Sequence, residues 1–461
     1  MSRTVRPDRR HAIVIGGSMA GLLAARVLSD HFAQVTLIER DLLPAQVEQR
    51  RGIPQGRHTH GLLASGRNVL EELFPGISEA LLKSGAVAGD IMRDSRWFFE
   101  GACLSRATSG LNGLLMTRPL LEAAVRQRVL ANPKVVRCDG VTVQELVVDR
   151  KAGRVTGVRA DAQTLSGDLV VDAMGRGSHS PQWLEQLGYE KPSKEAVHIA
   201  LGYTTRFFRR QLTDLKGDMA VVIPPTPEGK CGGVMLAQEG HRWTVTLIGY
   251  FGKYAPAELD GFIAFASTLP ARYIHEIVSR NEPLGDAVTA RFPASVRRRY
   301  EWLQRFPAGY LVFGDALCSF NPIYGQGMSV AALQAVELGK ALASADADAG
   351  LAKIFFRRAA KVVDIPWNIA VGSDLRIPET VGPRTAGVKL INWYISKLHK
   401  AGRSDPVPAL AFLKVANLLA PAPSIMHPRV AVRVLLGNLR PTRDVAEQST
   451  ALGASAAGNS K

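Results

Sequence analysis

The chain has 461 residues, of which 46% are hydrophobic and 21% are charged. This composition is typical of a globular protein and excludes a fibrous chain, a wholly disordered chain and a minimal binding module. The 57 lysines and arginines exceed the 41 aspartates and glutamates, so the formal net charge is +16. The basic residues form short clusters without interleaved aromatic side chains, and we therefore expect no nucleic-acid binding.

The four cysteines contain no CxxC pair, which argues against a zinc site or a disulfide framework and favours a reducing, cytoplasmic location. The longest apolar stretch late in the chain, residues 407–426, contains Lys414, Asn417 and three prolines. Polar groups and prolines of this kind are unfavourable in a membrane-spanning helix, so we expect no transmembrane segment.

The first predicted elements are a β-strand at residues 12–15 and a helix at 22–28. Between them lies a glycine-rich turn, Gly16-Gly17-Ser18-Met19-Ala20-Gly21. Gly16 permits the tight turn, the small Ser18 lets the backbone approach a pyrophosphate, and Gly21 allows the helix to pack closely on the strand. The N-terminus of the helix would face the phosphates.

A second strand is predicted at residues 35–38 and ends at Glu39, 23 residues after Gly16. A carboxylate at this spacing is suited to accept hydrogen bonds from an adenosine ribose. The two strands and the turn therefore predict a dinucleotide-binding site. The alternative is an ordinary strand–helix turn without a ligand.

Further along the chain, partial alternation of polar and apolar residues predicts an antiparallel sheet. Its strands are expected at residues 198–206, 219–223, 233–237 and 242–250. Such a sheet either forms one wall of an apolar substrate cavity or is purely structural.

A second strand–turn–helix pattern follows about 300 residues after the first one. A strand at 309–313 leads into Gly314-Asp315, and the segment Pro322-Ile323-Tyr324-Gly325-Gln326-Gly327 opens a helix at 328–342. The Asp315 carboxylate is placed to hold a ribityl hydroxyl, and the helix N-terminus to stabilise negative charge on a reduced flavin. Taken with the first turn, this pattern predicts FAD as the cofactor.

The segments GGSMAG with Glu39-Arg40, and GDALCSFNPIYGQG, resemble the two FAD motifs of class A flavoprotein monooxygenases. Residues 50–63, 117–128, 170–184 and 366–379 are similar to bacterial flavin epoxidases of the polyether and squalene type. The resemblance covers about residues 11–440. It implies an α/β, Rossmann-like fold of the glutathione-reductase type, with an inserted antiparallel β-sheet substrate domain and C-terminal helices.

The resemblance also implies a role for individual residues. Arg40 and Arg51 would lie near the adenosine and pyrophosphate, Arg118 near the flavin, and Val143 beside the adenine. The full implied set of FAD-binding residues is Gly16, Gly17, Ser18, Met19, Ala20, Gly21, Glu39, Arg40, Arg51, Arg118, Val143, Asp315, Gly325 and Gly327, the last two along the isoalloxazine ring.

The expected division of the chain follows the same pattern. FAD-binding segments occupy residues 1–195 and 291–382, and the inserted sheet domain occupies 196–290. A C-terminal helical region is expected at 383–445, followed by a disordered tail at 446–461. Within the helical region, basic amphipathic helices at 388–398 and 410–419 pack on the core, cover the cavity or contact a membrane surface.

His58 and His60 are one residue apart, a spacing that on a strand would mimic half of a metal site. No third ligand cluster accompanies them, so we expect no metal; the two histidines either pack in the core or contact the flavin, and His58 is kept only as a candidate catalytic residue. The family's middle Asp-Gly pair is Met174-Gly175 here, with an aspartate only at Asp172. The electron donor is therefore either NADPH or NADH directly, or a partner reductase.

The predicted function is an FAD-dependent monooxygenase that transfers one oxygen atom of dioxygen, through a flavin C4a-hydroperoxide, to a hydrophobic small-molecule substrate by epoxidation or hydroxylation. Two alternatives on the same fold are a flavin-dependent prenyl reductase and a flavin-dependent halogenase, although the paired-tryptophan halogenase motif is absent. An alternative from a different class is a non-catalytic lipid carrier.

Overall fold

A computed structural model describes residues 9–161, 163–344 and 347–439. Its first layer is a five-stranded parallel sheet in the order β17-β11-β1-β2-β7. Strands from the beginning, middle and late parts of the chain thus lie side by side, as in a Rossmann-like fold. The bounds of these strands are β1 (His11–Ile15), β2 (Gln34–Glu39), β7 (Val135–Asp139), β11 (Leu169–Asp172) and β17 (Tyr310–Val312).

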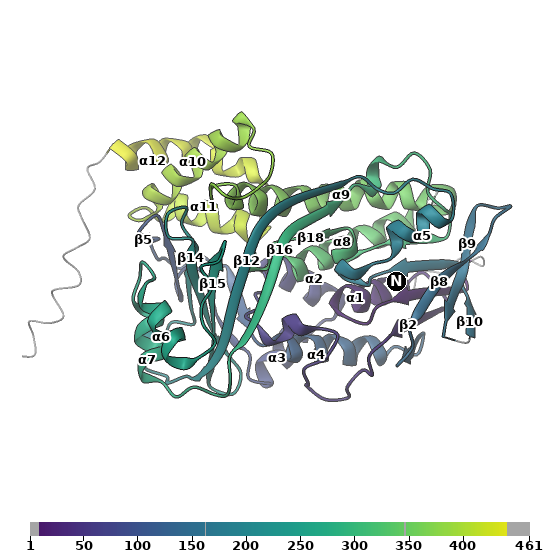
Figure 1. The fold of residues 1–461 in the computed structure, drawn as a ribbon, viewed down its shortest axis with the longest axis horizontal. Helices are drawn as coiled ribbons and strands as arrows, with labels where there is room; N and C mark the ends of the chain where they lie inside the picture. The colour runs from purple at the N-terminus through teal and green to yellow at the C-terminus, as the bar shows by residue number, and fades with distance from the viewer. Residues whose placement is uncertain (1–8, 162, 345–346, 440–461) are drawn as a thin grey trace, which may run out of the picture.

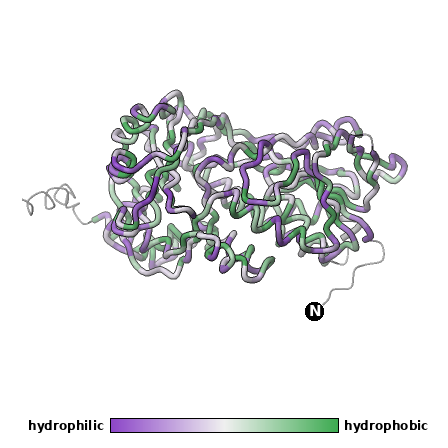
Figure 2. Tube along the Cα trace, turned by 90° about the horizontal axis from the view of Figure 1, so that it is seen from below, coloured by the Kyte–Doolittle hydropathy of each residue, from purple (hydrophilic) through white to green (hydrophobic). Residues whose placement is uncertain are grey.

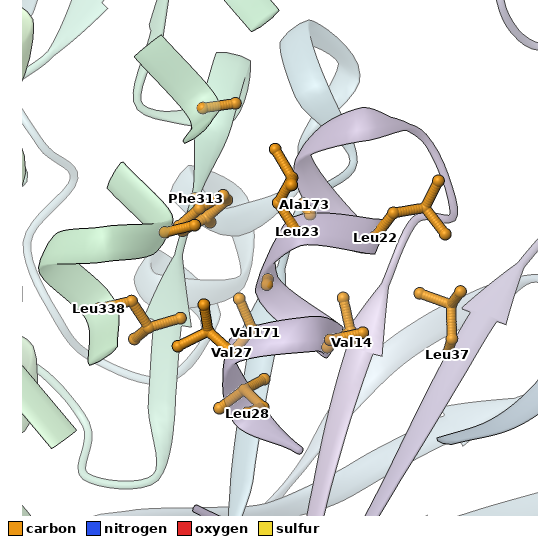
Figure 3. Close-up of a cluster of buried hydrophobic side chains, with 14 of the residues drawn as sticks. Val14, Leu22, Leu23, Val27, Leu28, Leu37, Val171, Ala173, Phe313 and Leu338 are labelled. Carbon is orange, nitrogen blue, oxygen red and sulfur yellow. The ribbon is translucent and has the colours of Figure 1, made fainter. Parts of the chain in front are cut away.

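Helix α1 (Met19–Leu28) packs on this sheet, and α8 (Gly327–Ala343) packs on α1. Figure 3 shows the apolar side chains where they meet, among them Val14, Leu23, Phe313 and Leu338. All four are fully buried. Burial of side chains of this size stabilises the fold by about 1.5–3 kcal/mol each. This packing fixes the turn after β1 and the turn after β17 relative to one another.

The second layer is an eight-stranded sheet in the order β18-β16-β12-β15-β14-β13-β4-β5. Its pairs are antiparallel except for β13 and β4, which are parallel. The long strands β12 and β16 run along the middle of the molecule (Figure 1). The strand bounds are β4 (Ser95–Phe99), β5 (Ala102–Cys103), β12 (Lys194–Arg209), β13 (Ala220–Ile223), β14 (Cys231–Gln238), β15 (Arg242–Tyr250), β16 (Val288–Arg298) and β18 (Cys318–Ser319).

The remaining helices cover these sheets, and α10, α11 and α12 lie together at one end of the molecule (Figure 1). Along the trace in Figure 2, hydrophobic and hydrophilic residues alternate, as expected for elements with one buried and one exposed face. The α-helices are α2 (Ala64–Leu73), α3 (Ile77–Lys83), α4 (Arg118–Leu130), α5 (Ser180–Gln186), α6 (Leu259–Ser267), α7 (Tyr273–Arg280), α9 (Ala347–Asp374), α10 (Ala386–Gly402), α11 (Pro406–Ala416) and α12 (Pro428–Leu439). Smaller strands are β3 (Val87–Asp90), β6 (Asn112–Leu115), β8 (Val143–Asp149), β9 (Arg154–Ala160) and β10 (Gln163–Ser166), and the 3-10 turns are η1 (Pro54–Arg57), η2 (Gly175–Gly177), η3 (Asp214–Gly217), η4 (Tyr300–Trp302), η5 (Gly314–Ala316), η6 (Pro322–Tyr324) and η7 (Ala422–Met426).

The fold predicted from the sequence is confirmed, with differences in detail. The large sheet also takes β4 and β5 from the first segment and the whole of β16, so its strands are not confined to residues 196–290. His58 and His60 do not lie on a strand, because the chain there leaves a 3-10 turn. The helix predicted over 410–419 ends at Ala416. The predicted tail, 446–461, lies outside the described residues, and no helix of the described part is long and apolar enough to cross a membrane.

Candidate cofactor and substrate site

One large cavity, of about 1070 Å³, joins the two sheets. It begins at the turn between β1 and α1, passes the turn after β17, and ends under α10 and α11. A cavity of this volume accommodates a dinucleotide together with a second ligand. The residues along it therefore divide into a cofactor end and an apolar end.

The turn after β1 leaves no room for side chains. Gly16 has φ +105°, and a Cβ there would lie 2.7 Å from the carbonyl oxygen of Ala173. Ser18 is the N-cap of α1, but its side chain makes no capping hydrogen bond, so the first amide groups of the helix keep their donors available. Arg118 donates to the Ser18 Oγ over 2.9 Å. Open backbone donors beside a guanidinium form a site suited to phosphate.

Arg50 is the centre of a buried ion-pair cluster behind this turn. Its guanidinium lies 2.7 Å from a carboxylate oxygen of Glu39 and 2.7 Å from one of Glu122, and it donates to the Gly17 carbonyl oxygen over 3.0 Å. Although burial opposes the charge, the two carboxylates raise the pKa of Arg50. Glu39 in turn accepts from the Gly17 N–H over 2.8 Å. The cluster therefore fixes Glu39 at the carboxyl end of β2, next to the turn.

Asp315 lies in the turn after β17 and lines the same cavity. No hydrogen bond or ion pair reaches its carboxylate from the described residues, and burial raises its pKa against the opposing charges of Arg118 and Arg176. Gly314, at φ +67°, makes the turn possible, and its N–H donates to Gln334 on α8 over 2.8 Å. The result is a fixed carboxylate that lines the cavity and has no partner in the part of the chain that the structure describes.

His58 and His60 line the cavity beside the sheet. The His58 Nδ1 lies 2.9 Å from the Thr205 hydroxyl, and the Thr246 hydroxyl lies 2.6 Å from those of both Thr205 and Thr59. Burial lowers the pKa of His58 to about 4 and that of His60 to about 3, each helped by a neighbouring arginine. Both rings are therefore neutral near pH 7. No group of three potential metal-ligating side chains occurs within the described ranges.

Beyond the turn that follows β17, Asp374 at the end of α9 forms a second buried network. Its Oδ1 accepts hydrogen bonds from Tyr250 over 3.0 Å, from Tyr324 over 2.9 Å and from Asn321 over 2.8 Å. Its Oδ2 has no partner among the described residues. Burial raises the pKa of Asp374 to about 7, although the three hydrogen bonds oppose that rise. The network holds the loop before α8 against the large sheet.

The raised pKa predicts a pH dependence of stability. The folded protein keeps the Asp374 proton to a higher pH than the unfolded chain, where the pKa is near 3.8. The contribution of Asp374 to the free energy of unfolding therefore falls as the pH rises from about 4 to about 7, by as much as about 4 kcal/mol. Because buried His58 and His60 contribute in the opposite direction over this range, the quantity to measure by urea denaturation is the difference in stability between the wild type and Asp374→Asn, which should fall by this amount as the pH rises. Because the other titrating groups are common to both proteins, parallel curves would contradict the prediction.

The cavity brings together most of the residues that the sequence predicted for cofactor binding. Arg51 is exposed and does not line the cavity, whereas its neighbour Arg50 is buried and does. Gly17, Met19 and Gly21 also lie outside the lining and support the turn from behind. Asp172 is fully buried and bound to Ser178 and Ser180, away from the cavity. The predicted residues that line it are Gly16, Ser18, Ala20, Glu39, Arg40, His58, Arg118, Val143, Asp315, Gly325 and Gly327.

Several lining residues were missed by sequence reasoning. Arg50 and Arg51 are adjacent, and only the packing against Glu122 shows which of them turns inward. Arg176, whose guanidinium lies 5.1 Å from the Phe292 ring centre, falls in the segment 170–184, but nothing in that segment marks it as a lining residue. His399 comes from a segment that has the pattern of an ordinary amphipathic helix. Their roles depend on tertiary contacts that no local pattern contains.

The donor set fits FAD in order along the cavity. Glu39 is placed for the ribose, the α1 N-terminus and Arg118 for the pyrophosphate, and the unpartnered Asp315 for a ribityl hydroxyl. Gly325, at φ +64°, keeps the loop before α8 free of side chains where a flat ring would pass. The cavity thus offers polar groups suited to the ribose, the pyrophosphate and the ribityl chain.

Comparison with known proteins gives the relationship of the whole chain. Protein Rv3254 of Mycobacterium tuberculosis (strain ATCC 25618 / H37Rv) is 34% identical over 465 residues, which are 95% of this chain and 96% of that protein. The chain belongs to the family of Protein Rv3254. Part of the chain is also similar to the chloroplastic zeaxanthin epoxidase of Oryza sativa subsp. japonica. The two are 26% identical over 175 residues, which are 36% of this chain and 25% of that protein. No family model matches the chain.

Several solved structures share the fold of this chain. PqsL, a probable FAD-dependent monooxygenase from Pseudomonas aeruginosa, superimposes with a TM-score of 0.61 at 16% identity, over 82% of this chain and all of that one. CmlS, a flavin-dependent halogenase, gives a TM-score of 0.60 at 17% identity, over 89% of this chain and 76% of that one. The chain therefore has the fold of flavin-dependent oxidoreductases, as the sequence predicted.

Proposed function

We propose that the protein is an FAD-dependent monooxygenase that inserts one oxygen atom of dioxygen into an apolar small molecule. The observation that carries this proposal is the continuity of the cavity. One space joins a dinucleotide-type turn at Gly16, a free carboxylate at Asp315 and an apolar chamber between the large sheet and α9–α11. A cofactor and a hydrophobic substrate would therefore meet near Gly325, with no separate nicotinamide domain required.

Each group at the junction has a definable task. FAD, when bound, supplies the chemistry that activates dioxygen. Arg118 and the N-terminus of α1 bind and orient the phosphates, and Asp315 holds the ribityl chain in place. The neutral His58 and His60 add polar edges without a charge that would draw in water. Apolar side chains of the sheet and of α10 exclude water from the reacting atoms, among them Val234, Ile248 and Ile395.

The polar groups near the junction do not include a residue that must act as an acid or base on the substrate. An oxygen insertion centred on the cofactor needs mainly position and dryness from the protein. This favours epoxidation of an alkene, in line with the sequence segments similar to polyether- and squalene-type epoxidases and with the partial similarity to zeaxanthin epoxidase. Electrons would come from NADPH or NADH, or from a partner reductase.

The test is oxygen incorporation under ¹⁸O₂. The protein is loaded with FAD, supplied with NADPH or with a general flavin reductase and NADH, and given farnesene, farnesol or phenol. We expect one labelled oxygen atom in an isoprenoid product, seen by mass spectrometry and absent under nitrogen. Turnover of phenol alone would contradict the substrate class. Incorporation of added bromide in place of oxygen would contradict oxygen insertion and identify a halogenase, the activity by which CmlS is named.

We also propose that the apolar end of the cavity receives its substrate at a membrane surface. Ile391 and Met426 both line the cavity and are exposed, so the cavity opens between α10 and η7. Leu390 and Trp393 are exposed on α10 beside this opening, as is Lys389. Apolar and basic side chains together favour an anionic lipid surface. Three further exposed leucines, Leu435, Leu436 and Leu439, lie at the C-terminal end of α12, which packs on α10.

The contact predicts binding to vesicles that contain phosphatidylglycerol. The double substitution Leu390→Glu and Trp393→Glu should lower the bound fraction in co-sedimentation about tenfold, because it replaces apolar contact by charge repulsion. Leu212→Glu is the control, since Leu212 is also exposed but lies in the loop between β12 and η3, away from α10. Equal loss of binding in the control would contradict a contact through α10.

A further inference from the structure

The apolar end of the cavity contains one buried histidine that the proposed function does not use. His399, on α10, lines the cavity and is only 2% exposed. Its ring stacks on Phe99 of β4 with the ring centres 4.2 Å apart, and the Phe412 ring of α11 meets it edge-on at 4.5 Å. Two aromatic rings from other elements thus hold the imidazole in one orientation.

Neither ring nitrogen of His399 has a hydrogen-bond partner among the described residues. The nearest acidic group is Glu100, whose Oε1 lies 4.0 Å from the His399 Nδ1. That carboxylate is already bound by Arg376 at 2.5 Å. A buried polar group without a partner costs about 1–3 kcal/mol, so both nitrogens have a strong preference for a polar ligand group.

The charges around the ring restrict what that group can be. Burial lowers the pKa of His399, so the imidazole is neutral and offers one donor and one acceptor. The neighbouring His399 and Arg376 lower the pKa of Glu100 to about 2, so this carboxylate is ionised and repels an anion. Arg376 and Arg403 beside it repel a cation. A hydroxyl group is neutral and can either donate to or accept from the one ring nitrogen that it faces, so it matches the site best whichever tautomer is present.

We propose that His399 is a specificity-determining residue that binds a hydroxyl group of an otherwise apolar substrate. The inference rests on the proposed function, and it narrows the substrate class from hydrocarbons to apolar alcohols. Ile391, Ile395 and His399 follow at intervals of four residues, so one face of α10 carries the apolar chain and its polar end. The alcohol would extend from His399 towards the cofactor end.

The test compares ligands with the same carbon skeleton. Farnesol carries a hydroxyl, farnesene carries none, and farnesoic acid carries a carboxylate. Their affinities for the FAD-loaded full-length protein are measured by displacement of Nile red. We expect farnesol to bind about tenfold more tightly than either of the others, the difference that one well-placed hydrogen bond supplies.

Variants assign the preference to the imidazole. His399→Phe should bind farnesol and farnesene equally, whereas His399→Gln, which keeps a donor and an acceptor, should retain part of the preference. Ile395→Ala, which shortens the apolar wall and leaves both rings around His399 in place, is the packing control and should weaken both ligands alike. The FAD content and the melting temperature of each variant report separately on folding. Normal FAD content with altered ligand preference therefore separates this inference from the proposed function.

Four results would overturn the inference. Equal binding of farnesol and farnesene by the wild type would do so, as would a preference that survives His399→Phe. Tightest binding of farnesoic acid would assign the site to an anion held by Arg376. Failure of all three compounds to displace the dye from the FAD-loaded protein would also reject it, while labelled oxygen in any isoprenoid product would leave the proposed function standing.

Discussion

Gly21→Ala should lower the free energy of unfolding by about 3 kcal/mol or more and abolish FAD binding. A Cβ at position 21 would lie 1.7 Å from the carbonyl oxygen of Gly16, which is backbone and cannot move aside without opening the turn. Relief of such an overlap requires α1 to shift away from β1, through the packing shown in Figure 3. Urea denaturation and a fluorescence titration with FAD measure the two effects.

The matched control is Gly177→Ala. Gly177 belongs to a turn that also lines the cavity, but a Cβ there meets nothing within 4 Å, and its φ is in the ordinary range. We expect its stability to change by less than about 0.5 kcal/mol and its FAD affinity to stay the same. A Gly21→Ala protein that is insoluble while Gly177→Ala is soluble agrees with the prediction. Wild-type stability and FAD binding in Gly21→Ala would refute the close packing of the turn.

Asp315→Ala should raise the Kd for FAD at least tenfold without destabilising the protein free of cofactor. The carboxylate has no partner among the described residues, and burial already opposes its charge. Its removal therefore takes away a desolvation cost in the free protein and a hydrogen-bond acceptor in the complex. The melting temperature of the variant without FAD should therefore stay the same or rise, whereas the titration should show a lower affinity for FAD.

A second carboxylate in the cavity wall provides the control for Asp315. Asp364 on α9 also lines the cavity, but it forms an ion pair with Arg297 at 2.7 Å. Asp364→Asn should leave the FAD affinity unchanged, because this carboxylate already has a protein partner. If Asp315→Ala binds FAD as the wild type does, or if both variants lose affinity equally, the assignment of Asp315 to the cofactor is wrong.

The two glycine turns could be read from the sequence because their constraints are local. The turn requires a positive φ at position 16 and a small side chain at position 18. Both requirements fall at fixed positions within a single strand–turn–helix unit, so glycine and serine there can be recognised. Glu39 ends the next strand at a predictable distance. The same holds for Asp315, which follows a strand and precedes a helix.

The substrate end could not be read in this way. His399 acquires its environment from Phe99 and Phe412, which lie about 300 residues and 13 residues away in the chain. The joining of β4 to β13 likewise pairs segments more than 100 residues apart. Amphipathic patterns identify α10 as a helix but do not decide which of its faces lines a cavity. That choice is made by the packing of several elements at once.

The most direct measurement of the central claim is the flavin content of the full-length protein. After incubation with FAD and removal of the excess, the absorbance spectrum and the protein concentration give the number of bound FAD molecules per chain. We expect one in the wild type and in Asp364→Asn, and fewer in Asp315→Ala because its higher Kd lets FAD escape during removal of the excess. A folded wild-type protein that retains no FAD would contradict the central claim, and would leave the cavity to a non-catalytic carrier of apolar molecules.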